Sequence, residues 1–146
     1  MADSSSLYHD VLLDHYRRPR NFHEMADATR VERGHNPACG DDVTVWLRIE
    51  DGVVADVSFK GVSCAVTRAS ASMMTTLVKG KTLADAEALF DRFQQLVMGQ
   101  IADAEHDASL GGLRIFAGVS RLPMKVKCAI LPWHALRAAL RPPAGG

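Results

Sequence analysis

Two runs of alternating apolar and polar residues, separated by a short turn, predict a β-hairpin. The apolar positions are Val43, Val45, Leu47 and Ile49 in the first run, and Val53, Ala55, Val57 and Phe59 in the second. A two-residue Asp51-Gly52 loop would place apolar residues opposite polar ones across the hairpin. We therefore expect a three-residue loop that pairs Ile49 with Val53 and Val45 with Val57.

Apolar residues at helical spacing predict four helices. These lie approximately over residues 7–16, 66–77, 83–97 and 130–140. Thr82 and Asp85 form a capping box at the start of the third helix. Because proline is tolerated only in the first turn of a helix, Pro132 indicates that the last helix begins close to Cys128. The polar, glycine-containing segment 100–112 is expected to form a loop, with room for a short helix.

The order of these elements, strands first and helices after, favours an α+β fold. We expect a small antiparallel three-stranded sheet with helices packed on one face. Neither an internal repeat nor a low-complexity segment interrupts the pattern, and the only linker-like piece is the PPAGG end. The sequence is therefore expected to form a single domain over residues 1–146.

Charge and composition exclude several classes of partner. The chain has 17 Lys and Arg against 17 Asp and Glu, so its formal net charge is zero, and there is no basic footprint for nucleic acid. No apolar stretch approaches the roughly twenty residues of a membrane span, and the first residues do not resemble a signal peptide. We expect a cytoplasmic protein that binds neither nucleic acid nor a membrane.

Three cysteines carry the candidate chemistry, because in a reducing compartment they are metal ligands, reactive thiols or small core residues. If the hairpin register continues, Cys39 lies opposite Ser63, next to Cys64, and both sulfurs can reach one ion at the open end of the hairpin. Asp41 could supply an oxygen ligand beside them. Next to Gly40, however, Asp41 is equally typical of a turn.

The predicted helices suggest how the sulfurs would ionise. Cys64 and Cys128 are both expected at helix starts, where the positive end of the helix lowers a thiol pKa and favours the thiolate. The spacing contains no Cys-x-x-Cys pair, so inert core cysteines in an interaction module remain an alternative on spacing alone. His35, four residues before Cys39, is the only histidine with metal-like spacing, and we expect most of the six histidines at the surface.

Five segments, in order, resemble the U-type iron–sulfur cluster assembly proteins, the IscU/NifU N-terminal family. They are LYHDVLLDHYRRPRN (7–21), NPACGD (36–41), GVSCAVTRASASMM (61–74), VKGKT (78–82) and GVSRLPMKVKCAIL (118–131). The family's three cysteines match Cys39, Cys64 and Cys128, and its aspartate matches Asp41. The resemblance implies a metal site of three thiolates and one carboxylate at one end of the sheet.

Two departures from the family's scaffold-type members are similar to its SufU branch. Lys127 stands where scaffold-type members carry a histidine, immediately before Cys128, and they lack the stretch that falls here approximately between Leu96 and Leu113. SufU proteins bind Zn²⁺ and accept sulfur from a cysteine desulfurase. The resemblance therefore implies a zinc-dependent sulfur acceptor and carrier, a sulfurtransferase-like role, with Cys39 as the catalytic residue.

The same resemblance implies the partners and leaves one alternative. The partners would be a SufS-type cysteine desulfurase and downstream iron–sulfur assembly proteins. The alternative is a scaffold on which a [2Fe-2S] cluster assembles on the same residues, and Fe²⁺ could also replace Zn²⁺ because thiolate sites bind both ions. Whether the protein turns over as an enzyme or acts as a stoichiometric carrier stays open.

Overall fold

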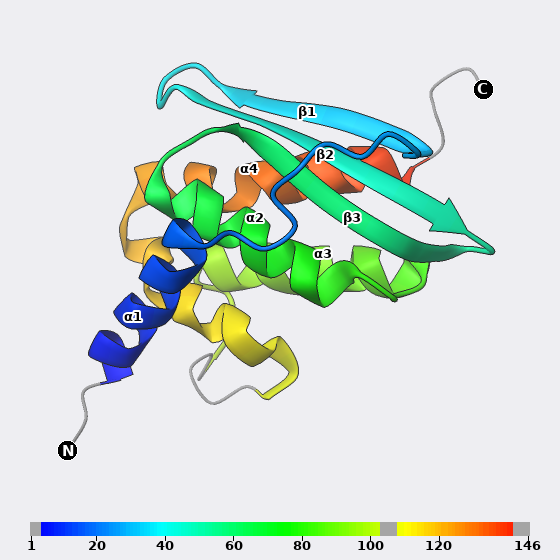
Figure 1. Cartoon of the computed structure of the whole chain (residues 1–146). Helices are drawn as coiled ribbons and strands as arrows, with labels where there is room; N and C mark the ends of the chain where they lie inside the picture. Colours follow the sequence, from blue (N-terminus) through cyan, green and yellow to red (C-terminus); the bar gives the residue numbers. More distant parts are fainter. Residues whose placement is uncertain (1–3, 103–107, 142–146) are drawn as a thin grey trace.

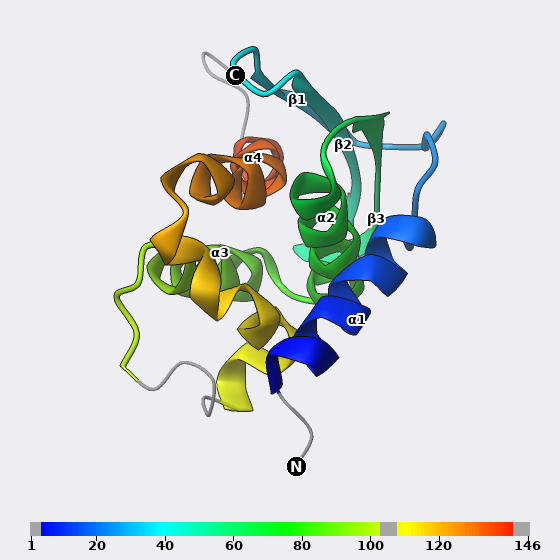
Figure 2. The same cartoon turned by 90° about the vertical axis from the view of Figure 1, so that its left-hand side faces the viewer.

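A three-stranded antiparallel sheet in the order β1-β2-β3 carries helices on one face in the computed structural model, which describes residues 4–102 and 108–141 (Figure 1). The elements are α1 (Ser4–Arg17), β1 (Arg30–Asn36), β2 (Asp41–Glu50), β3 (Val53–Val62), α2 (Ala65–Val78), α3 (Leu83–Val97), η2 (Ala108–Arg121) and α4 (Pro123–Leu140). Helices α2 and α4 contact the sheet, and α3 and η2 pack behind α4 (Figure 2). The predicted α+β fold is confirmed.

The hairpin between β2 and β3 turns through two residues, so the predicted three-residue loop is wrong. Asp51 and Gly52 both have positive φ angles, 53° and 75°, and Glu50 pairs directly with Val53. This is the backbone that a two-residue primed turn requires, and glycine adopts it without strain.

A register shift in the hairpin then brings apolar residues opposite each other again, although a two-residue loop alone would pair them with polar residues. The register shifts between Arg48 and Ile49, after which Val45 lies opposite Phe59. The predicted partner of Val45 was Val57, two residues away. Because side chains alternate with a period of two, Val57 and Phe59 still face the core as predicted, whereas between the bulge and the turn Val54 is buried in place of Val53 and Ala55.

Strand β1 has no apolar alternation and could not be located from its pattern. Its sequence, RVERGHN, is mostly exposed, as expected of an edge strand that is held by backbone pairing with β2. One inward position is Gly34, where an added Cβ would lie 3.2 Å from a methyl group of Leu131. The missing side chain lets α4 approach the sheet closely at this point.

The core between α2, α3 and α4 is built around Trp133. Its ring stacks on Phe93 with centroids 4.6 Å apart, and Phe116 of η2 meets Phe93 edge-on. The indole nitrogen donates to the Ser70 hydroxyl at 3.0 Å, and that hydroxyl donates to the carbonyl of Ala129 at 2.6 Å. The hydroxyl therefore links α2 to α4 at two points in the interior.

Helix α4 begins earlier than predicted. Pro123 occupies the first turn, Cys128 follows in the second turn, and Pro132 lies inside the helix. Pro132 has no N–H to donate to the carbonyl of Cys128, four residues before it. The buried residues Trp133 and Leu136 that follow hold the helix against the sheet and α2, so packing overrides the local cost of the proline.

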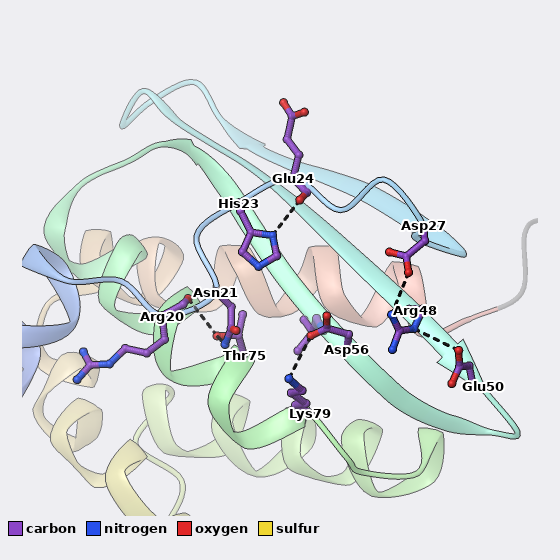
Figure 3. Close-up of polar contacts among 11 residues, drawn as sticks. Arg20, Asn21, His23, Glu24, Asp27, Arg48, Glu50, Asp56, Thr75 and Lys79 are labelled. Atoms are coloured by element: carbon purple, nitrogen blue, oxygen red, sulfur yellow. Dashed lines mark hydrogen bonds and ion pairs between the residues drawn. The ribbon is translucent and has the colours of Figure 1, made fainter.

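The segment between α1 and β1 crosses the other face of the sheet. Asn21, with φ 57°, donates its side-chain amide to the Thr75 hydroxyl at 3.0 Å and accepts the backbone N–H of Phe59 at 3.0 Å. Met25 of this segment is buried, and Asp27 pairs with Arg48 at 2.9 Å (Figure 3). These contacts fasten α1 and the segment after it to α2 and the sheet.

The predicted loop 100–112 is only partly confirmed. Residues 103–107 lie outside the described residues, and from Ala108 the chain forms the 3-10 element η2, which is kinked at Gly111. Its Leu113 and Phe116 are buried against α3.

Within residues 4–102 and 108–141, no helix combines the length and apolar character needed to cross a membrane.

His15 is half-buried, whereas His9, His23, His35 and His134 are exposed, in line with the prediction that most histidines lie at the surface. Nδ1 of His15 lies 2.8 Å from the Ser72 hydroxyl, which also accepts the backbone N–H of Arg20 at 2.9 Å. Burial lowers the pKa of His15, and the neighbouring Arg20 charge lowers it further. The packing of α1 against α2 therefore favours the neutral form of the His15 imidazole.

We predict that replacing Ser70 by Ala lowers the free energy of unfolding by about 1–3 kcal/mol, because it strands a buried indole N–H and a buried carbonyl. Urea unfolding measures the change. In a cycle with Trp133→Phe, the double variant should lose less stability than the sum of the single variants. Strict additivity would show that the two groups are not coupled.

A second prediction concerns pH. The pKa of His15 in the folded protein lies below its ordinary value of about 6.5, so the folded state binds fewer protons than the unfolded state. The contribution of His15 to the free energy of unfolding is therefore present above pH ~6.5 and is lost as the pH falls through the folded pKa. Urea midpoints between pH 7.5 and 5 should fall more steeply for the wild type than for His15→Asn. His134, whose pKa is also lowered by burial and by Arg137, titrates in both proteins. Equal slopes would contradict the assignment.

Candidate metal centre

Cys39, Asp41 and Cys128 form one cluster at the end of the sheet. One ligand atom from each residue lies within 4.8 Å of the other two, and the Cys39 and Cys128 sulfurs are 3.7 Å apart. Four ligands around Zn²⁺ at a Zn–S bond of about 2.3 Å would have sulfurs about 3.8 Å apart. The donor types and this spacing fit a tetrahedral, thiolate-rich metal site.

The turn between β1 and β2 presents Cys39. The Asn36 side chain accepts the backbone N–H of Ala38 at 3.2 Å, and the Asn36 carbonyl accepts that of Cys39 at 3.2 Å. Gly40, with φ 72°, then closes the turn into β2. Cys39 is half-buried there, as expected for a residue in a surface turn.

Cys64 occupies the N-cap of α2, as predicted. It follows the end of β3, where Gly61 pairs with Val43 of β2 and an added Cβ would lie 2.0 Å from the carbonyl oxygen of Asp42. The Cys64 amide donates to Oδ1 of Asp41 at 2.9 Å. Its sulfur, however, is not within 4.8 Å of all three cluster atoms, so the structure brings together three of the four predicted ligands and places the fourth beside them.

Asp41 is fully buried and held by two donors. Besides the Cys64 amide, the Thr67 hydroxyl donates to Oδ2 of Asp41 at 2.8 Å. The same hydroxyl lies 3.3 Å from the Cys64 sulfur. The sequence analysis did not identify Thr67, whose only signal was its position three residues after Cys64 at the start of a helix.

The sulfurs ionise unequally. Burial raises the pKa of Cys128 to about 12, together with the charge of Cys64 and hydrogen bonds with Cys64, Cys39 and Asp41. For Cys64, burial also acts to raise the pKa, but the hydrogen bonds of the Thr67 side chain and backbone and of Cys128 outweigh it, and the pKa is lowered. The prediction that a helix start activates Cys128 is wrong, because Cys128 lies buried in the second turn of α4.

Exposed basic side chains follow one another in the sequence up to Cys128. His35 is exposed, and no histidine of residues 4–102 and 108–141 joins the metal-ligand group. Arg121, Lys125 and Lys127, next to or near Cys128 in the sequence, are exposed and form no ion pair with any described residue. Two or more thiolates beside a buried carboxylate concentrate negative charge, which a bound cation would offset.

Comparisons with known proteins match this chain to one sequence family over most of its length. The sequence model for the NifU-like N terminal domain matches residues 7–141. The zinc-dependent sulfurtransferase SufU of Bacillus subtilis (strain 168) is 36% identical over 145 residues, covering 99% of this chain and 97% of that protein. The iron–sulfur cluster assembly scaffold protein IscU of Streptococcus pyogenes serotype M1 is 36% identical over 141 residues, covering 97% and 87%.

Solved structures show the same fold. A protein of Fervidobacterium islandicum AW-1, described as an iron–sulfur cluster assembly scaffold protein for the SUF system, superimposes with a TM-score of 0.85 at 31% identity and covers 95% of this chain and 100% of that one. A NifU-like N-terminal domain from Brucella abortus, at 23% identity, has a TM-score of 0.83 and covers 94% of each chain.

Proposed function

The chain belongs to the NifU-like N-terminal domain family, and on that premise we propose that it is a zinc-dependent sulfur acceptor and carrier for iron–sulfur cluster assembly. The observation that carries the proposal is the cluster of Cys39, Asp41 and Cys128, with Cys64 beside it. The similarity to a zinc-dependent sulfurtransferase over almost the whole chain supports it.

Zn²⁺ is assigned to Cys39, Asp41, Cys64 and Cys128. Structural zinc sites have four protein ligands, Zn²⁺ accepts both thiolate and carboxylate, and thiolates favour Zn²⁺ over hard cations such as Mg²⁺. Bound Zn²⁺ would hold the coordinating thiols as thiolates. Cys64 is included because its amide contacts Asp41 and its sulfur lies beside Thr67, which contacts the same carboxylate.

Cys39 is assigned as the sulfur acceptor because it lies in a turn, whereas Cys64 is fixed at a helix start and Cys128 is buried within α4. The Cys39 thiolate attacks the outer sulfur of a persulfide on the donor protein. The donor S–S bond breaks, the donor cysteine leaves as a thiolate, and Cys39 carries the persulfide.

The donor that this chemistry requires is a cysteine desulfurase, which we propose to be of the SufS type, in the cytoplasm. The exposed Lys125 and Lys127 close to Cys128 present positive charge to such a partner. Downstream iron–sulfur assembly proteins would then receive the sulfur.

A scaffold for a [2Fe-2S] cluster is the second candidate. The observation that favours it is the equal identity, 36%, to the S. pyogenes scaffold protein. Against it stands Lys127 immediately before Cys128, together with a cluster that includes no histidine among the described residues.

We predict about one zinc per chain in protein purified without added metal, and a colourless solution. The triple Cys39, Cys64 and Cys128 to serine variant should contain none. Elemental analysis with a visible absorption spectrum measures both. Bound iron with a brown colour would instead support the scaffold, and equal metal in the variant would remove the cluster from the proposal.

We predict that Cys39→Ser abolishes persulfide transfer, because serine does not form a stable persulfide. A cysteine desulfurase charged with radiolabelled cysteine supplies the sulfur, and label on the protein is measured on a non-reducing gel. Ala38→Ser, in the same turn, is the matched control and should accept label like the wild type. Labelling of Cys39→Ser at the wild-type rate would exclude Cys39 as the acceptor.

A further inference from the structure

We propose that Thr67 is a positioning residue of the metal centre, whose hydroxyl fixes the Asp41 carboxylate for coordination. The proposal rests on the proposed function, in that it assumes a metal ion bound to the cluster. Thr67 is not one of the four assigned ligands, and it acts through Asp41 and Cys64.

The two donors that hold Asp41 both come from the start of α2. Oδ1 accepts the Cys64 amide at 2.9 Å and Oδ2 accepts the Thr67 hydroxyl at 2.8 Å, so each carboxylate oxygen has one donor. Two hydrogen bonds from a rigid helix start fix the plane of the carboxylate. Each oxygen keeps lone pairs, which leaves an oxygen of Asp41 available to an ion near the Cys39 and Cys128 sulfurs.

The Thr67 hydroxyl also contacts two of the assigned ligands at once. It lies 2.8 Å from Asp41 and 3.3 Å from the Cys64 sulfur. Thr67 has one hydroxyl hydrogen, and both the Asp41 carboxylate and the Cys64 sulfur lie within hydrogen-bond reach of this hydroxyl. Removing the hydroxyl would therefore loosen the carboxylate and the neighbouring sulfur together.

The hydrogen bond between the Thr67 hydroxyl and the Asp41 carboxylate lies in the protein interior. Thr67 and Asp41 are both fully buried, so water cannot replace the hydrogen bond when it is removed. Groups that orient metal ligands typically change metal affinity by about 10–100-fold when they are lost. A hydroxyl that only stabilised the start of α2 would change folding stability and leave metal retention unaffected.

The experiment compares Thr67→Val, which keeps the shape and removes the hydroxyl, with Thr67→Ser, which keeps the hydroxyl. Thr75→Val is the matched control, because Thr75 is also a fully buried threonine of α2 and its hydroxyl bonds the Ser72 carbonyl, away from the cluster. Zinc affinity is measured by competition with a chromophoric chelator. The visible spectrum of the Co²⁺-loaded proteins reports the ligand geometry directly, and urea unfolding of the metal-free proteins reports stability.

We expect zinc affinity to fall at least about 10-fold in Thr67→Val, with altered Co²⁺ bands, and to return close to the wild-type value in Thr67→Ser. Thr75→Val should lose stability and keep both metal readouts. Wild-type affinity and spectrum in Thr67→Val would overturn the positioning role while leaving the zinc proposal intact. A wild-type protein that binds no metal at all would overturn the proposed function and, with it, this inference.

Discussion

Burial of the Asp41 carboxylate is the constraint on which the candidate site depends. A carboxylate removed from water is costly unless hydrogen bonds and opposite charge compensate. Two donors at the start of α2 supply the hydrogen bonds, so β2 and α2 must meet at this point. The surrounding thiols add no positive charge, and the cluster is therefore suited to a cation.

The position of Cys128 depends on contacts deeper in the core. The residue after it, Ala129, is held through its carbonyl by Ser70, six residues beyond Cys64 on α2. The same hydroxyl accepts the indole of Trp133. These bonds hold α4 against α2. As a result, the sulfurs of Cys64 and Cys128 lie close together although the two residues are far apart in the sequence. The packing of two helices thus fixes Cys64 and Cys128, whereas the turn between β1 and β2 contributes Cys39.

Much of this arrangement could be predicted because it follows from periodicity. The alternation along β2 and β3 predicted most of the core-facing side of the hairpin. It also predicted that Cys39, Asp41 and Cys64 lie together at its open end, although the predicted register was wrong by two residues. The start of α4 could not be predicted, because the burial of residues after Pro132 overrides a local rule about proline. Thr67 was missed for a similar reason: its partner Asp41 is 26 residues away, and nothing in its own helix marks it.

Pro132 has a mechanical consequence for α4. The backbone ladder of a helix is its main source of stiffness, and a proline removes one rung between itself and the carbonyl four residues before it. Here that carbonyl belongs to Cys128, so the missing backbone hydrogen bond lies at the level of the candidate ligand. Bending of α4 at this point can accommodate a small displacement of the Cys128 sulfur. The buried residues around Trp133 meanwhile keep their contacts with the sheet and α2.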